Sequence, residues 1–186
     1  MKAALLITEG FEEAEAVIVY DILCRLDVDV DVISCTDLRI LTVDAYFSLS
    51  VNAGKHIDNA RLTLYDAVII PGGPASTEDM SRAPKVIEFI QQHDLREKWI
   101  CALCSAPARV LGQNYLLHDR NYTCSGELWQ TCPDGKYTGE NIVVDGNLIT
   151  GKGLGVAFEF AFTIAEAMTR ESNKIQKQKE HIYFTR

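Results

Sequence analysis

Short apolar runs of strand length alternate with helical patterns along this chain, and no other feature restricts its fold so strongly. The apolar runs that predict strands lie at residues 2–8, 28–34, 66–71 and 99–103. Apolar residues at helical spacing predict helices at residues 12–26, 84–93, 106–111 and 155–168. This alternation is typical of an α/β fold with a mostly parallel central sheet.

Two segments predict antiparallel additions to that sheet. Residues 41–51 are expected to form an excursion, and Asp145-Gly146 is a strong hairpin signal between strands at 141–144 and 147–150. The tail from about residue 169 is polar, with a possible docking point at residues 182–184. We expect one domain over residues 1–186, because the sequence contains neither a repeat nor a linker.

Charge and hydropathy limit the partners that the chain can have. A net charge of −8 and a pI near 5.0, without a cluster of basic and aromatic residues, oppose nucleic-acid binding. No apolar stretch is long enough to span a bilayer, and the N-terminus has no signal-peptide pattern. We therefore expect no membrane association, a cytoplasmic location and six reduced cysteines.

The stretch WICALCSAPARVL, residues 99–111, predicts a strand that turns sharply into a helix. Cys104 lies at this corner, where a helix N-terminus favours the thiolate. The alternative is that Cys104 is a small buried hydrophobic residue.

The segments that follow three strands are expected to meet at one sheet edge, because ligands bind at the carboxyl ends of parallel strands. These are residues 9–15, Gly72-Gly73 and Cys104-Ser105. The backbone N–H groups of Gly73 and Ser105 are candidate donors to an oxyanion. One acid among Glu12, Glu13 and Glu15 could exchange a proton with the thiol; alternatively, the three acids form a solvated first helical turn.

Four motifs in this order resemble the ThiJ/PfpI superfamily, in particular the branch of the parkinsonism-associated protein deglycase and its bacterial relatives. They are GFEEAEAV (10–17), VIIPGGP (68–74), CALCSAPARVL (101–111) and GKGLGVAFEFAFTIAEAM (151–168). The resemblance implies a flavodoxin-like three-layer sandwich with a nucleophile elbow. It also implies chemistry that needs neither a metal nor an organic cofactor.

The resemblance assigns roles to individual residues. It implies that Cys104 is the reactive, oxidation-prone residue and that Glu15 is the acid hydrogen-bonded to its thiol. It places the backbone donors on Gly73 and Ser105. It further implies a homodimer formed through the face of the first helix, which makes Asp21 and Arg25 interface candidates, although both suit an ordinary helix surface.

The chain departs from the family at one position. Many members carry a histidine near the elbow cysteine, just after the strand that follows it, and in NYTCSGELW we place Cys124 at that position. The four histidines, at 56, 93, 118 and 181, do not match it, although His118 is six residues upstream. Without an imidazole base, a protease or amidase activity is disfavoured. Cys124 is either a redox partner of Cys104 or a filler of an apolar wall.

Three other motifs are weaker. Cys101-x-x-Cys104 is similar to a redox motif, but Cys101 falls inside the strand. The spacing of Cys101, Cys104, Cys124 and Cys132 does not suit zinc. The glycine-rich segment at 151–155 lacks a complete phosphate-binding pattern, so tight packing near the site is expected there.

The resemblance therefore implies a glyoxalase or deglycase activity on small reactive carbonyls, with the Cys104 thiolate as nucleophile. The alternative is a redox-sensing or stress-protective protein in which Cys104 is oxidised without turnover.

Overall fold

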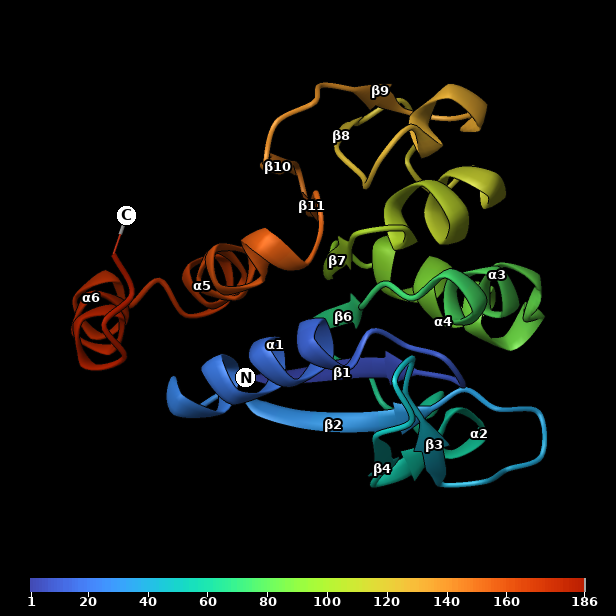
Figure 1. Ribbon diagram of the computed structural model, residues 1–186, viewed down its shortest axis with the longest axis horizontal. Coiled ribbons are helices and arrows are strands. Elements are labelled where there is room, and N and C mark those ends of the chain that lie inside the picture. Colours follow the sequence, from blue (N-terminus) through green and yellow to red (C-terminus); the bar gives the residue numbers. More distant parts are fainter. Residues whose placement is uncertain (186) are drawn as a thin grey trace.

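A central sheet between two layers of helices organises the computed structural model, which describes residues 1–185 (Figure 1). In spatial order the sheet contains β10 (Ile142–Asp145), β11 (Leu148–Gly151), β7 (Trp99–Leu103), β6 (Ala67–Ile70), β1 (Lys2–Ile7), β2 (Asp29–Ser34) and β5 (Lys55–His56). All neighbouring strands are parallel except β10 and β11, which form the hairpin expected around Asp145-Gly146. The predicted flavodoxin-like α/β sandwich is confirmed.

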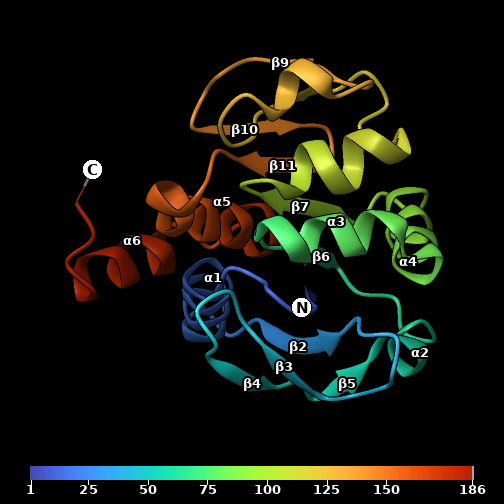
Figure 2. The ribbon, with the colours of Figure 1, turned by 45° about the vertical axis from the view of Figure 1, so that its right-hand side comes forward.

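The helices cover both faces of the sheet. One face carries α1 (Glu13–Arg25) and α5 (Ala157–Thr169), and the opposite face carries α2 (Ile57–Ala60), α3 (Pro74–Arg82), α4 (Pro84–Asp94) and the π-helix η1 (Pro107–Leu111). The last helix, α6 (Ser172–His181), packs outside α5 and projects from the body of the molecule (Figure 2). No helix among residues 1–185 is both long and apolar enough to cross a membrane.

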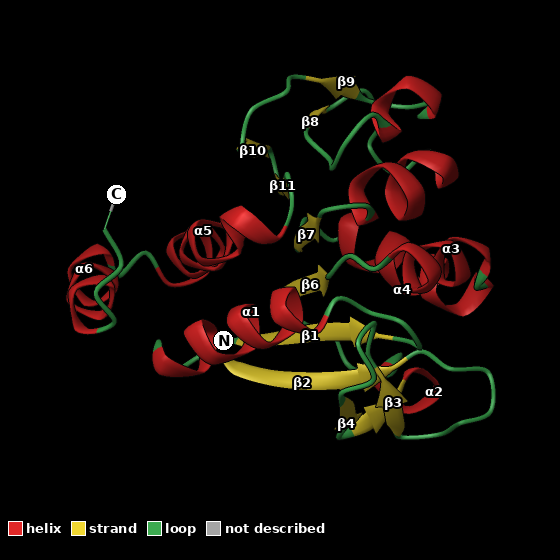
Figure 3. Cartoon of the chain, viewed as in Figure 1, coloured by secondary structure: helices red, strands yellow, loops and turns green. Residues whose placement is uncertain are grey.

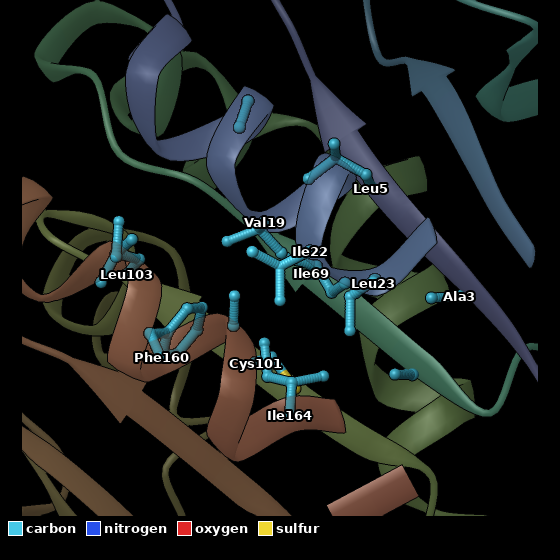
Figure 4. Packing of buried hydrophobic residues seen from close by; sticks show 14 of the residues in the cluster. Ala3, Leu5, Val19, Ile22, Leu23, Ile69, Cys101, Leu103, Phe160 and Ile164 are labelled. Carbon is cyan, nitrogen blue, oxygen red and sulfur yellow. The ribbon is translucent and has the colours of Figure 1, made fainter. Parts of the chain in front are cut away.

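Alternation along the strands divides the core in two, because successive side chains of a strand point to opposite faces. Leu5 of β1 packs under α1 and α5, whereas its neighbour Leu6 packs under α4. In β7, Cys101 and Leu103 face the first layer beside Phe160 and Ile164 of α5 (Figure 4). Strands that are buried on both faces explain the continuous apolar runs in the sequence.

Short strands and helical turns lie outside the central sheet (Figure 3). The expected excursion is the antiparallel pair β3 (Thr42–Asp44) and β4 (Ser50–Asn52). A second small sheet pairs β8 (Asn121–Tyr122) with β9 (Lys136–Tyr137). The remaining turns are the 3₁₀-helices η2 (Gly112–Asn114), η3 (Leu128–Thr131) and η4 (Leu154–Val156).

The C-terminal tail contains more structure than its polar composition suggests. It forms α6, and Lys174 of this helix pairs with Asp27, at the end of the α1 segment, at 2.6 Å. Phe184 packs on Phe162, with ring centroids 5.3 Å apart, so the expected docking point exists. Tyr183 is 90% exposed and takes no part in it.

The order of the strands fixes where a site can form. The chain runs from β1 outward to β2 on one side and returns to β6 on the other, so the topology reverses between β1 and β6. Parallel α/β sheets bind ligands at such a point, beyond the carboxyl ends of the strands. The segments after β1, β6 and β7 meet there, as the sequence predicted.

Candidate functional site

Cys104 follows β7 directly and adopts a left-handed backbone conformation, with φ of 62°. Few residues other than glycine adopt such a conformation, so it identifies a tight elbow. Two hydrogen bonds hold the elbow: the Cys104 N–H donates to the Gly151 carbonyl (3.0 Å), and the Ser125 N–H donates to the Cys104 carbonyl (2.8 Å). The predicted strand-to-helix corner is therefore present, although the helix that follows is a π-helix.

Glu15 lies in the first turn of α1 and is fully buried. Its Oε2 accepts a hydrogen bond from the Gly72 N–H at 2.7 Å, and its carboxyl group hydrogen-bonds to the Cys104 thiol. Gly72 separates the two groups so closely that a Cβ there would lie 2.8 Å from Glu15 Oε2 and 2.9 Å from Cys104 Sγ. Of the three candidate acids, Glu15 is thus the one placed against the sulfur.

Burial dominates the protonation of this pair because water is excluded from both groups. It raises the pKa of the Glu15 carboxyl to about 7. Burial, with the charge of Glu15 beside it, raises the pKa of the Cys104 thiol to about 11. Burial therefore opposes the thiolate that the helix N-terminus was expected to favour. The structure instead combines a thiol with a base whose pKa is close to neutrality.

One of the two predicted backbone donors is in contact with the thiol. The Ser105 N–H hydrogen-bonds to the Cys104 sulfur and lowers the pKa of the thiol. Gly73 is the N-cap of α3, where the first N–H groups of a helix have no partner inside it. Its φ of 111°, with Gly10 O only 2.3 Å from where a Cβ would be, allows no side chain.

Ser125 is a site residue that the sequence analysis missed. Its hydroxyl hydrogen-bonds to the Cys104 sulfur and lowers the pKa of the thiol. The adjacent residue, Cys124, is fully buried and packs in the core on the opposite face of the sheet. One residue after the position where relatives were expected to carry histidine, a hydroxyl therefore contacts the thiol. The only sequence signal that could have identified Ser125 is that neighbouring side chains point alternately to opposite sides of the chain.

Three of the four histidine rings have polar partners other than the thiol. His56 Nε2 contacts the Thr36 carbonyl at 2.7 Å, and His93 Nε2 accepts from the Tyr65 N–H at 3.0 Å. His118 pairs with Asp94 at 3.2 Å.

The other cysteine motifs do not form a second centre in the described part of the chain. Cys101 is fully buried within β7, as expected from its place in the apolar run. Within residues 1–185 no group of three or more His, Cys, Asp or Glu side chains is arranged to hold a metal ion. The glycine-rich segment packs beside the site, since a Cβ on Gly153 would lie 3.9 Å from Cys104 Sγ.

The fold and the elbow define a class, the flavodoxin-like α/β proteins that carry a cysteine at the switch point beside a buried glutamate. The chain belongs to the DJ-1/PfpI family, whose model matches residues 1–167.

Individual relatives agree with this assignment. The chain is 28% identical over 171 residues to the glutathione-independent glyoxalase DJR-1.2 of Caenorhabditis elegans, covering 90% of this chain and 89% of that protein. It is 30% identical over 173 residues to the DJ-1 homolog B of Arabidopsis thaliana. The matched region covers 93% of this chain but only 39% of that protein. The crystal structure of a mutant DJ-1 superfamily protein from Salmonella typhimurium is 42% identical, with a TM-score of 0.97 over 100% of this chain and 99% of that one.

Proposed function

We propose that this protein converts small 2-oxoaldehydes, such as methylglyoxal, into hydroxyacids, with Cys104 as the nucleophile and Glu15 as the proton carrier. The observation that carries the proposal is the buried contact between the thiol and a carboxyl whose pKa is raised to about 7. A base with that pKa takes up and releases a proton readily at neutral pH. The relative that is named a glyoxalase supports the same class of substrate.

The first step joins sulfur to the aldehyde carbon. Glu15 removes the thiol proton while Cys104 Sγ attacks that carbon, which gives a hemithioacetal oxyanion. The N–H groups of Gly73 and Ser105 would stabilise the negative oxygen.

The second step moves a proton within the adduct. Glu15 first gives the thiol proton to the oxyanion, which restores its carboxylate. The carboxylate then removes the proton from the former aldehyde carbon and delivers it to the neighbouring carbonyl carbon, while the hydroxyl proton of the adduct passes to the oxygen of that second carbon. The first carbon is thereby oxidised and the second is reduced. The product is a thioester of the hydroxyacid, and water hydrolyses it to release the acid and the thiol. The step balances without an external oxidant or reductant, and it uses no group beyond this chain and water.

The test is lactate formation from methylglyoxal without glutathione. We expect turnover by the wild-type protein and none by Cys104→Ser. Cys132→Ser removes a partly buried thiol outside the site and should retain turnover. Equal turnover by the wild type and Cys104→Ser would refute the proposal.

Oxidation of Cys104 without turnover stays the alternative prediction. Cys124 packs with the opposite core from the one that Cys104 contacts, but the two thiols lie near enough to each other to interact electrostatically. Peroxide treatment followed by peptide mass analysis distinguishes a Cys104–Cys124 disulfide from oxygen added to Cys104 alone. A wild-type protein without turnover that gains either product would favour the sensor.

We further propose that two copies associate through the α1 face. Val17 is 48% and Tyr20 is 41% exposed there, and both line an apolar groove of about 390 Å³. Asp21 and Arg25 pair with each other on the same helix at 2.6 Å. Sedimentation should show a dimer that Val17→Asp dissociates, whereas Leu95→Asp, at an exposed leucine after α4, should leave it intact. A monomeric wild type would refute the proposal.

A further inference from the structure

A buried pair of hydroxyl groups connects the two loops that carry the backbone donors. Thr77 lies in the first turn of α3 and is fully buried, and Ser105 is 4% exposed. Their oxygens, Thr77 Oγ1 and Ser105 Oγ, are 3.0 Å apart. Thr77 Oγ1 also lies 2.8 Å from the Gly73 carbonyl oxygen. One side chain therefore contacts both Gly73 and Ser105.

The direction of each hydrogen bond follows from the number of protons. A carbonyl cannot donate, so the single hydroxyl proton of Thr77 goes to the Gly73 carbonyl. Ser105 must then donate its own proton to Thr77 Oγ1. Since that proton is committed, the Ser105 side chain cannot donate to a substrate oxyanion, and only its backbone N–H remains for that role.

We propose that Thr77 is a positioning residue for the oxyanion site: its hydroxyl fixes the Gly73 loop against the Cys104 elbow and thereby sets the spacing of the two N–H donors. The role of these donors in turnover rests on the proposed function. The effect on the thiol does not, because the Ser105 N–H hydrogen-bonds to the Cys104 sulfur in the resting protein. Arg109 forms a second connection between the segment after Cys104 and the start of α3, since its Nη1 donates a hydrogen bond to the Pro74 carbonyl at 2.8 Å.

The neighbouring residue provides a matched control. Ser76 lies on the same turn of α3 and is equally buried, but its hydroxyl has no hydrogen-bond partner within residues 1–185. Ser76→Ala therefore removes a buried oxygen from the same helix without breaking the connection between the loops.

The experiment measures two quantities, the rate of Cys104 alkylation by iodoacetamide as a function of pH and the turnover of methylglyoxal. Alkylation is read at the Cys104 peptide by mass spectrometry. Thr77→Val keeps the shape of the side chain but removes the hydroxyl. We expect it to raise the apparent pKa of the thiol, to slow alkylation at pH 8 by about three- to tenfold, and to lower kcat by a similar factor with little change in KM.

Conservative variants separate positioning from packing. Thr77→Ser restores the hydroxyl and should return alkylation and kcat to near the wild-type values, and Ser76→Ala should change neither. If Thr77→Val does not fold, Ser105→Ala breaks the connection from the other side, and its alkylation must slow in the same way.

The proposal is overturned if Thr77→Val alkylates like the wild type, if Thr77→Ser fails to restore the rate, or if Ser76→Ala slows it equally. Should Thr77→Val fail to fold, wild-type alkylation by Ser105→Ala overturns it instead. Failure of the proposed function gives a different pattern: the wild type makes no lactate, yet the alkylation series still decides the role of Thr77.

Discussion

Glu15 and Gly72 are joined across the switch point of the sheet by a hydrogen bond of 2.7 Å from the Gly72 N–H to Glu15 Oε2. This bond lowers the pKa of the Glu15 carboxyl, but burial raises that pKa by more, so that it is about 7. The bond also directs the carboxyl group of α1 towards the sulfur that follows β7. Segments that follow three different strands thus meet at one buried pair of titratable groups.

Glu15→Gln should separate thiolate formation from turnover. Because the charge of Glu15 raises the pKa of the Cys104 thiol, its removal lowers that pKa and speeds alkylation at neutral pH. Turnover of methylglyoxal should nevertheless fall by about 10²- to 10⁴-fold, since the proton carrier is lost. Wild-type kcat/KM should rise with pH through about 7, and the variant should lose this dependence. Glu12→Gln is the control; unchanged values in Glu15→Gln would assign proton transfer to another group.

The same variant should change how stability depends on pH. The carboxyl has a pKa of about 7 in the folded protein, against an ordinary value of 4.5. The folded state therefore binds the proton more tightly, and this contribution to stability is complete below pH 4.5 and is lost as the pH rises through 7. Relative to wild type, Glu15→Gln should gain on the order of 1–3 kcal/mol between pH 5 and pH 8 in urea unfolding. A difference that does not vary with pH would contradict the raised pKa.

Ser125→Ala should make Cys104 less acidic. The Ser125 hydroxyl lowers the pKa of the thiol, so its loss should slow alkylation at pH 8 by about threefold. Ser125→Thr keeps a hydroxyl and should react at nearly the wild-type rate. If both variants behaved alike, the effect would come from packing rather than from the hydrogen bond.

Gly73→Ala should destabilise the protein strongly. A Cβ at this position would lie 2.3 Å from Gly10 O and 2.9 Å from Phe11 Cα, and the φ of 111° is unfavourable for any side chain. We expect a loss of more than about 3 kcal/mol in urea unfolding. Gly146→Ala, with a positive φ but no atom within 4 Å, should lose only about 1 kcal/mol. Equal losses would show that backbone conformation alone, and not the contact with Gly10, demands glycine at position 73.

The central strands β1, β6 and β7 were predictable because each is an apolar run long enough to be buried on both faces. Helix α3 was missed because its sequence, PASTEDMSR, has no apolar stripe; Pro74 at its start was the usable signal. Helix α6 was missed for the same reason, since Ile175 is its only buried residue.

The residues that form the candidate site were easier to predict from the sequence than the protonation of its groups. Cys104 and Glu15 came from motif order, and the structure places them in contact. Ser125 was missed because the motif comparison selected its neighbour, Cys124. Adjacent side chains point to different sides of the chain, so a shift of one residue changes which of them faces the sulfur. The effect of burial on the thiol could not be predicted, because it depends on how much water the folded site excludes, and the apolar neighbours that exclude water come from segments far apart in the chain.

The hydrogen bond from the Cys104 N–H to the Gly151 carbonyl has a consequence for synthesis. The site needs residues 15, 72, 104 and 125, and its elbow closes only when residue 151 has joined the sheet beside β7. A growing chain emerges from the ribosome in order, so more than four-fifths of this one must be translated before the elbow can close. Until then Cys104 is an ordinary thiol, open to any oxidant or electrophile in its surroundings.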